Sequence, residues 1–301
     1  MSHPDTRIIA LSDALILEII NAIGLPKTGG MVRLFRPIFG KAARRLSIIG
    51  VTADHLIATD GFASAAAWML TNWCNRVTSR GAETVPVKGP LLVISNHSGS
   101  YDTFVIASQL GREDLKLISS DVPFLKNLPN ANSHILFLSD KTHDRMTAAR
   151  AGIRYLKDGG ALLLYGTGLI DPDPEVYPDA SAWIEKWLPS IDLFLRTVPE
   201  TQVVLSIVSG VVARRWARHP ITWFKSIDWQ KRRLAEFSQV IQQLFFPWSL
   251  TLEPHISFST PVGVDRLLCE SPGERPLPAV KARGKVLLAA HMDWVNVLMN
   301  L

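Results

Sequence analysis

The rhythm of the chain changes at Pro86, and this change restricts the possible folds more than any other feature of the sequence. Beyond it, short apolar runs alternate with longer segments in which apolar residues recur at helical spacing. This alternation predicts an α/β fold, with a mainly parallel or mixed sheet flanked by helices. The expected strands are Leu91–Ser95, Leu117–Ser120, His134–Leu138, Ala161–Tyr165, Val203–Ser209 and His255–Ser259. The expected helices are Tyr101–Leu110, Thr142–Lys157, Ala180–Arg196 and Trp229–Phe246.

The residues before Pro86 show helical spacing instead, and Gly61–Val77 is expected to form one of their helices. We therefore expect two parts: a helical, membrane-facing section over residues 1–85 and an α/β domain over residues 86–301. Leu267–Ala279 is polar and proline-rich, which indicates a linker before a last helix. No apolar stretch reaches the length of about 20 residues that spans a bilayer, and no signal peptide is recognised.

Basic residues are concentrated in two segments, Met31–Arg45 with five and Val211–Arg233 with seven. The rest of the chain carries 20 basic and 26 acidic residues, so the net charge of +5 arises from these two segments. Aromatic residues interleave with the basic ones, which is typical of contact with an anionic membrane surface. Packing against the core, with solvated charges, is the alternative. No nucleic-acid-binding motif is recognised, so we expect no nucleic acid partner.

A group of polar residues directly follows the expected strand Leu91–Ser95: Asn96-His97-Ser-Gly-Ser-Tyr-Asp102. α/β folds carry reactive groups at this end of a strand. The turn lets the carboxylate of Asp102 reach one imidazole nitrogen of His97, which fixes the tautomer and raises the basicity of the other nitrogen. No G-x-S-x-G nucleophile accompanies the pair, so the base is expected to activate a substrate hydroxyl. A plain turn followed by a capped helix is the alternative interpretation.

This segment resembles the N-H-x4-D block of the glycerol-phosphate and lysophospholipid acyltransferase superfamily, of the 1-acylglycerol-3-phosphate acyltransferase type. The likeness extends from Pro86 to about Val262. Further segments resemble the later blocks of the family in the right order; they are Lys116–Phe124, Leu136–Lys141, Leu163–Gly168 and Val203–Gly210.

The resemblance implies transfer of a fatty acyl group from acyl-CoA or acyl carrier protein to a lipid hydroxyl, in phospholipid synthesis. His97 would be the general base, and Asp102 would orient it. The substrate-binding residues that it implies are Asn96, Ser98, Gly99, Lys141, Tyr165, Thr167 and Gly168. No cofactor is implied beyond the acyl donor. The histidines lack metal-ligand spacing and the two cysteines are far apart, so we expect no metal ion and a cytoplasmic protein on the inner face of the membrane.

The sequence departs from the family pattern where that pattern places arginines associated with the acceptor phosphate. Lys141 replaces one arginine, Ile170 stands near the position of another, and Thr167 replaces a glutamate. We favour a lysophosphatidate-like acceptor because Lys141 keeps the charge, although lysine binds phosphate only as a point charge. Three alternatives stay open: a lipid acceptor without phosphate, thioester hydrolysis, and a non-catalytic lipid-binding role.

Overall fold

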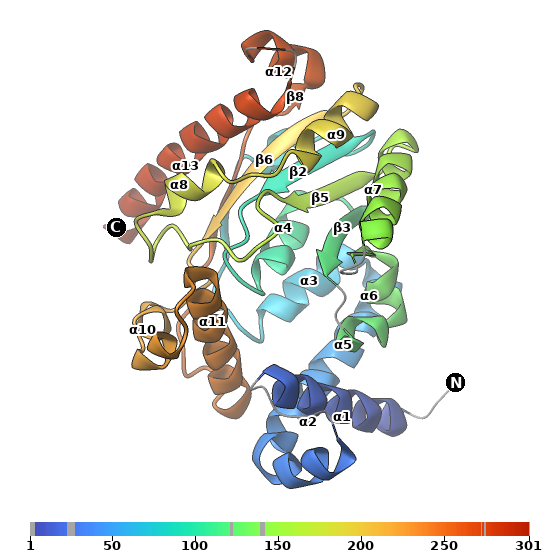
Figure 1. The fold of residues 1–301 in the computed structure, drawn as a ribbon, viewed down its shortest axis with the longest axis vertical. Coiled ribbons are helices and arrows are strands. Elements are labelled where there is room, and N and C mark those ends of the chain that lie inside the picture. Colours follow the sequence, from blue (N-terminus) through green and yellow to red (C-terminus); the bar gives the residue numbers. More distant parts are fainter. Residues whose placement is uncertain are drawn as a thin grey trace.

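The computed structural model describes residues 4–22, 28–120, 123–138, 142–271, 273 and 275–300. Within these residues, eight strands form one sheet (Figure 1). They are β1 (Thr78–Arg80), β2 (Leu91–Ser95), β3 (Leu115–Ser120), β4 (Ile135–Leu138), β5 (Ala161–Tyr165), β6 (Gln202–Ser209), β7 (His255–Phe258) and β8 (Val262–Gly263). Their order is β1-β7-β6-β2-β5-β3-β4, and β8 pairs with β6. All pairs are parallel except β6–β7 and β6–β8, so the sheet is mixed.

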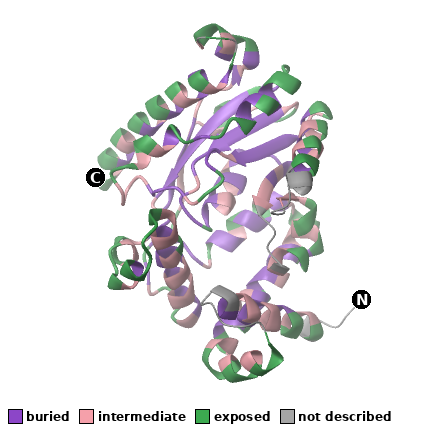
Figure 2. Ribbon diagram, in the orientation of Figure 1, coloured by how far each residue is buried: buried purple, intermediate pink, exposed green. Residues whose placement is uncertain are grey.

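Helices cover both faces of the sheet, because the central strands are apolar on both sides. The side chains of β2 alternate between two cores: Leu91 and Val93 face one, and Leu92 and Ile94 face the other. The first core includes residues of α2 (Gly29–Asp60), α3 (Phe62–Leu70) and α4 (Asp102–Leu110). The second includes residues of α7 (Thr142–Lys157), α8 (Ala180–Ile184), α9 (Ser190–Thr197), α12 (Val264–Glu270) and α13 (Leu277–Met299). Figure 2 shows the sheet as the most buried part of the molecule.

The remaining elements pack around these two layers, and α11 (Asp228–Phe245) adds Leu244 to the first core. The helix α1 (Pro4–Ala22) packs on α2 through a small apolar cluster of its own. Two short helices precede β4, and three elements follow β6. The two before β4 are α5 (Pro123–Lys126) and α6 (Pro129–Ser133), and the three after β6 are α10 (Arg214–Ala217), η2 (Pro220–Phe224) and α11. A single turn, η1 (Ala82–Thr84), follows β1. No helix of the described residues has the length and apolar character needed to cross a bilayer.

The predicted α/β class is confirmed, and each of the six predicted strands is present. The sequence missed β1 and β8, which have three and two residues and no apolar alternation. Because β1 lies before Pro86, the sheet also draws on residues 1–85. The single helix expected over Ala180–Arg196 is wrong: it divides into α8 and α9, and α9 begins directly after Pro189, which disfavours a continuous helix through this point.

Two other boundaries also differ from expectation. The helix expected over Gly61–Val77 ends at Leu70, after which the backbone turns toward β1. The linker expected over Leu267–Ala279 is partly helical, since α12 continues to Glu270 and α13 begins at Leu277. Polar and proline-rich composition therefore indicated the break between these helices but not its length.

Candidate active site

The turn after β2 is fastened to β6, its neighbour in the sheet. The side-chain amide of Asn96 donates to the carbonyl of Val208 over 2.8 Å, and its oxygen accepts from the Val208 N–H over 2.9 Å. The Ser98 hydroxyl donates to the same carbonyl over 2.9 Å. Asn96 and Ser98 are both buried. In this structure their polar atoms hold the turn in place, so that the residue between them, His97, has a fixed position.

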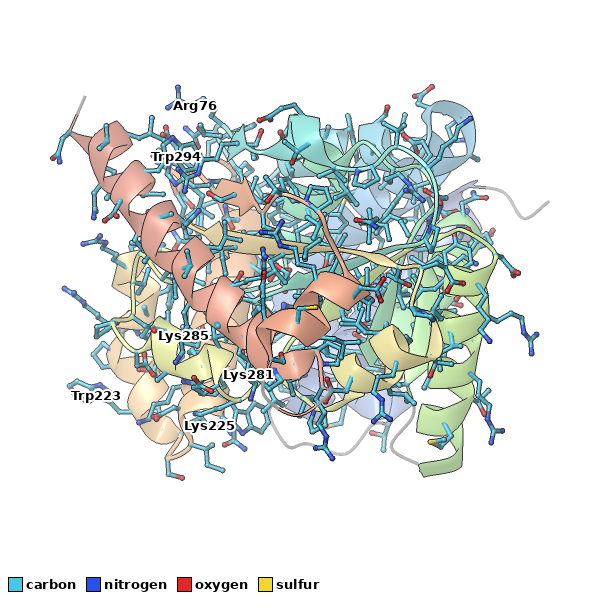
Figure 3. All side chains as sticks on the ribbon, turned by 90° about the horizontal axis from the view of Figure 1, so that it is seen from above. Arg76, Trp223, Lys225, Lys281, Lys285 and Trp294 are labelled. Carbon is cyan, nitrogen blue, oxygen red and sulfur yellow. The ribbon has the colours of Figure 1, made fainter. Side chains whose placement is uncertain are left out.

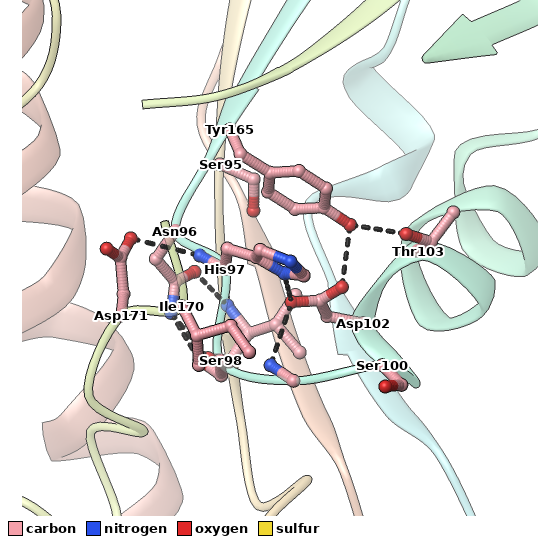
Figure 4. A network of polar contacts seen from close by, with 12 residues as sticks. Ser95, Asn96, His97, Ser98, Ser100, Asp102, Thr103, Tyr165, Ile170 and Asp171 are labelled. Carbon is pink, nitrogen blue, oxygen red and sulfur yellow. Dashed lines mark hydrogen bonds and ion pairs between the residues drawn. The ribbon is translucent and has the colours of Figure 1, made fainter. Parts of the chain in front are cut away.

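The expected pair of His97 and Asp102 is formed (Figure 4). Nδ1 of His97 and Oδ2 of Asp102 lie 2.8 Å apart, and the Gly99 N–H donates to the same carboxylate oxygen over 3.2 Å. Asp102 is fully buried and is the first residue of α4. Within the described residues Nε2 of His97 has no hydrogen-bond partner, and 25% of the side chain is exposed. Such an imidazole can accept or donate a proton at Nε2.

Tyr165, the last residue of β5, completes the support of Asp102. Parallel pairing sets Tyr165 beside Ser95, at the same end of the sheet as His97. Its hydroxyl donates to Oδ1 of Asp102 over 2.6 Å, and its ring stacks on the imidazole of His97 at 4.1 Å between centroids. Burial, and then the charge of Asp102, raises the pKa of Tyr165 well above its ordinary value. The phenol therefore stays protonated and acts as a donor to the carboxylate.

The loop after β5 holds the backbone of His97 through Asp171. The His97 N–H donates to the Asp171 carboxylate over 3.0 Å, and the Asp171 N–H donates to the His97 carbonyl over 2.6 Å. The hydroxyl of Thr167 donates to the other oxygen of this carboxylate over 2.5 Å. Gly168 adopts a φ of 66°, a backbone conformation that favours glycine. Burial raises the pKa of Asp171 to about 6, despite these hydrogen bonds.

Glu236, from the middle of α11, is a third buried carboxylate at this site. It accepts a hydrogen bond from the Ser100 N–H, and burial raises its pKa. A Cβ atom added at Gly99 would lie 3.2 Å from Oε1 of Glu236, which is closer than most such contacts. The absence of a side chain at Gly99 thus lets α11 approach the turn.

The charge state of His97 depends on these carboxylates. Burial lowers the pKa of the imidazole, but the charge and hydrogen bond of Asp102 raise it, as do the charges of Glu236 and Asp171. The balance raises the pKa of His97 to about 9. The imidazole therefore holds a proton at neutral pH in this arrangement, and its base form becomes populated as the pH rises.

All but one of the site residues expected from the sequence gather at the C-terminal ends of β2 and β5. They are Asn96, His97, Ser98, Gly99, Asp102, Tyr165, Thr167 and Gly168. Lys141 lies outside the described residues. Asp171 and Glu236 also belong to the site, although they were not among the residues predicted from the sequence. An acidic loop after β5 was a signal for Asp171, but Glu236 lies in a helix with no distinguishing pattern around it.

Neither the family models nor the curated proteins contain a match to the chain. Among solved structures, the chain is similar to the crystal structure of the 1-acyl-sn-glycerophosphate (LPA) acyltransferase, PlsC, from Thermotoga maritima. The sequence identity is 14%, the TM-score is 0.43, and the alignment covers 97% of this chain and 98% of that chain.

Proposed function

We propose that the chain is an acyltransferase that moves a fatty acyl group from acyl-CoA or acyl carrier protein to a lipid hydroxyl. The observation that supports this proposal is the pair of His97 and Asp102, in which Nδ1 is held by a carboxylate and Nε2 has no described partner. No serine or cysteine side chain of the described residues forms a hydrogen bond with His97. A base without a nucleophile beside it suits activation of a hydroxyl that the substrate brings.

The proposed reaction uses this geometry. The neutral form of His97 accepts the proton of the acceptor hydroxyl at Nε2, while Asp102 stabilises the imidazolium that forms. The hydroxyl oxygen attacks the thioester carbonyl, and a tetrahedral intermediate results. Its collapse breaks the C–S bond, forms the ester, and releases a thiolate that takes the proton from the imidazolium. Tyr165 keeps Asp102 in place throughout, because its hydroxyl and its ring hold both members of the pair.

The acceptor that we propose is a lysophosphatidate-like lipid, used in phospholipid synthesis. A lipid hydroxyl without a neighbouring phosphate is the alternative acceptor, and water would make the protein a thioesterase. Incubation with labelled acyl-CoA or acyl carrier protein and a panel of lyso-lipids, followed by lipid mass spectrometry, separates these outcomes. Consumption of the donor at the same rate without any lipid would replace transfer by hydrolysis.

Replacement of His97 with alanine tests the catalytic assignment. Because the base is removed, transfer should fall by a factor of about 100 or more, while the circular dichroism spectrum stays unchanged. His55→Ala, an exposed histidine on α2, is the matched control and should keep wild-type turnover. Wild-type turnover by His97→Ala would refute the mechanism. Absence of product with wild-type protein and every lipid tested would leave the non-catalytic lipid-binding role.

We further propose that the protein acts at an anionic membrane surface on the cytoplasmic side. The side chains of Trp223 and Phe224 are 77% and 86% exposed, an uncommon position for large aromatic residues. Figure 3 shows Trp223 and the nearby Lys225 directed away from the body of the molecule. The neighbouring exposed basic residues are Arg214, Arg215, Arg218 and Lys225. Aromatic side chains beside cationic ones match the interface between anionic headgroups and acyl chains.

The basic part of α2 supports the same proposal. Leu34 and Ile38 are 64% and 56% exposed on a helix whose exposed basic residues include Arg33 and Arg36. This mixture is typical of a helix that lies in the membrane interface. A pocket of about 360 Å³ opens beside this part of α2 and has three basic side chains on its wall, those of Lys41, Arg44 and Arg45. Figure 1 places the start of α2 and α10 toward the same end of the molecule.

A further inference from the structure

Arg232 differs from the other basic residues of its segment because it is buried. Only 6% of the residue is exposed, whereas its neighbour Arg233 is exposed. The guanidinium carbon lies 4.1 Å from the ring centroid of Trp183 and 6.0 Å from that of Tyr177. Arg232 belongs to the segment Val211–Arg233, which is predicted to face a membrane, and its burial removes it from that surface.

The guanidinium of Arg232 lacks the partners that a buried charge requires. Its Nε donates to the Ile170 carbonyl over 3.3 Å, but Nη2 is buried without a hydrogen-bond partner among the described residues. Within the same residues no carboxylate forms an ion pair with it. The charges of Asp179, Asp228 and Asp171 favour the guanidinium without a direct ion pair. Arginine stays protonated in proteins, so a buried N–H donor without a hydrogen-bond partner is still unfavourable. The unmatched donor therefore points to an anion that binds from outside the chain.

Arg232 lies beside the candidate active site. The carbonyl that it contacts belongs to Ile170, which precedes Asp171, the residue that holds the backbone of His97. Glu236 follows Arg232 by four residues on the same face of α11, about 6 Å along the helix axis, and it contacts the turn after His97. An anionic group at Nη2 would thus lie beside the loop that holds the backbone of His97.

We propose that Arg232 binds the phosphate group of the acyl acceptor and so determines which lipid hydroxyl the enzyme acylates. This assignment rests on the proposed acyl transfer. A guanidinium donates two parallel hydrogen bonds to phosphate, and its stacking on Trp183 fixes the plane in which they are offered. The acyl donor also carries phosphate groups, so the measurements must separate the two sources.

Binding is measured first, in a form of the protein that cannot turn over. Calorimetric titration of His97→Ala with a short-chain lysophosphatidate, and with the monoacylglycerol of the same chain, isolates the contribution of the phosphate. Added Arg232→Gln should weaken lysophosphatidate binding by about tenfold or more and leave monoacylglycerol binding unchanged. Added Arg233→Gln is the matched control, because it removes an exposed charge from the next position of the helix. Equal lysophosphatidate affinity in the two double variants would overturn the proposal.

Kinetics in the presence of the catalytic base give the second test. Arg232→Gln should raise KM for lysophosphatidate by about tenfold or more, with KM for the acyl donor unchanged. The variant Arg232→Lys keeps the charge without the bidentate geometry. Its KM for lysophosphatidate should lie between those of the wild type and Arg232→Gln, and it guards against loss of folding as the cause. A raised KM for acyl-CoA alone would assign Arg232 to the donor and overturn the proposal. If lysophosphatidate binding depends on Arg232 but no lipid is acylated, the anion site stands and the proposed acyl transfer fails.

Discussion

Replacement of Glu236 with glutamine should make the protein a better catalyst at neutral pH. Glu236 is buried and its charge helps to raise the pKa of His97 to about 9. At pH 7 an imidazole with this pKa is in the base form in only about 1 molecule in 100. The value of kcat/KM should therefore rise about tenfold per pH unit from pH 7 toward pH 9, and then level off.

The glutamine side chain keeps the shape and the acceptor oxygen that the Ser100 N–H requires, but it removes the charge. The pKa of His97 should fall, and each unit of that fall increases the base form at pH 7 about tenfold. The charge of Glu236 acts on His97 less strongly than that of Asp102, so a fall of about half a unit to one unit is expected, and kcat/KM at pH 7 should rise about three- to tenfold. The gain should vanish above pH 9, where His97 is neutral in both proteins.

The assay is the pH profile of kcat/KM from pH 6 to 10, with Glu83→Gln, an exposed glutamate, as the matched control. An NMR titration of the His97 ring, assigned by its loss in His97→Gln, reports the same pKa without turnover. The reasoning fails if the profile of Glu236→Gln coincides with that of the wild type or moves to higher pH. A lower plateau above pH 9 together with an unmoved midpoint would likewise show that Glu236 acts by structure and not by charge.

Three other changes have defined outcomes. Tyr165→Phe removes a donor from Asp102 but keeps the stacked ring, so kcat should fall by about tenfold, with the midpoint of the pH profile moved upward; a midpoint that moves downward would contradict this. Asp173→Ala leaves three backbone N–H groups of the loop after β6 without their acceptor, so chemical denaturation should show a loss of about 3 kcal/mol or more; a loss below about 1 kcal/mol would contradict that network. Replacing Arg214, Arg215 and Arg218 with glutamate should reduce co-sedimentation with anionic vesicles at low salt, and transfer to a short-chain acceptor should persist; equal pelleting would show that this segment is ordinary surface.

The strands of the sheet could be predicted because each carries its own local signal. The strand β2 is buried at all five positions and apolar at the first four, since both of its faces are covered, and its neighbours β5 and β6 are likewise mostly apolar and buried. Strand order carries no such signal. The antiparallel pairing of β7 with β6 joins residues about 50 positions apart, and the addition of β1 beside β7 joins residues about 180 positions apart. No pattern within a short window indicates them.

The contacts of the candidate site likewise divide into local ones, which could be predicted from the sequence, and contacts between distant elements, which could not. His97 and Asp102 are five residues apart, so the turn between them could be derived from the sequence and is present in the structure. Tyr165 was placed near the substrate, but its bond to Asp102 follows from the register of β5 with β2. Glu236 lies more than a hundred residues further along the chain, and its contact with the turn depends on how α11 packs. The pair of His97 and Asp102 could therefore be predicted from the sequence, whereas the buried charge of Glu236, which raises the pKa of His97, could not.

The face of α11 that meets the turn links two properties that are usually considered separately. Glu236 acts on the proton affinity of His97, and Arg232, one helical turn earlier, offers the buried donor for an anion. A phosphate held by Arg232 would add negative charge near His97 and raise its pKa further, which opposes its action as a base. Binding of a phosphate-bearing acceptor therefore disfavours deprotonation of His97. Loss of the Glu236 charge should lower the pKa of His97 by a similar amount with either acceptor, so Glu236→Gln should gain a similar factor in kcat at pH 7 with a phosphate-bearing acceptor and with a monoacylglycerol.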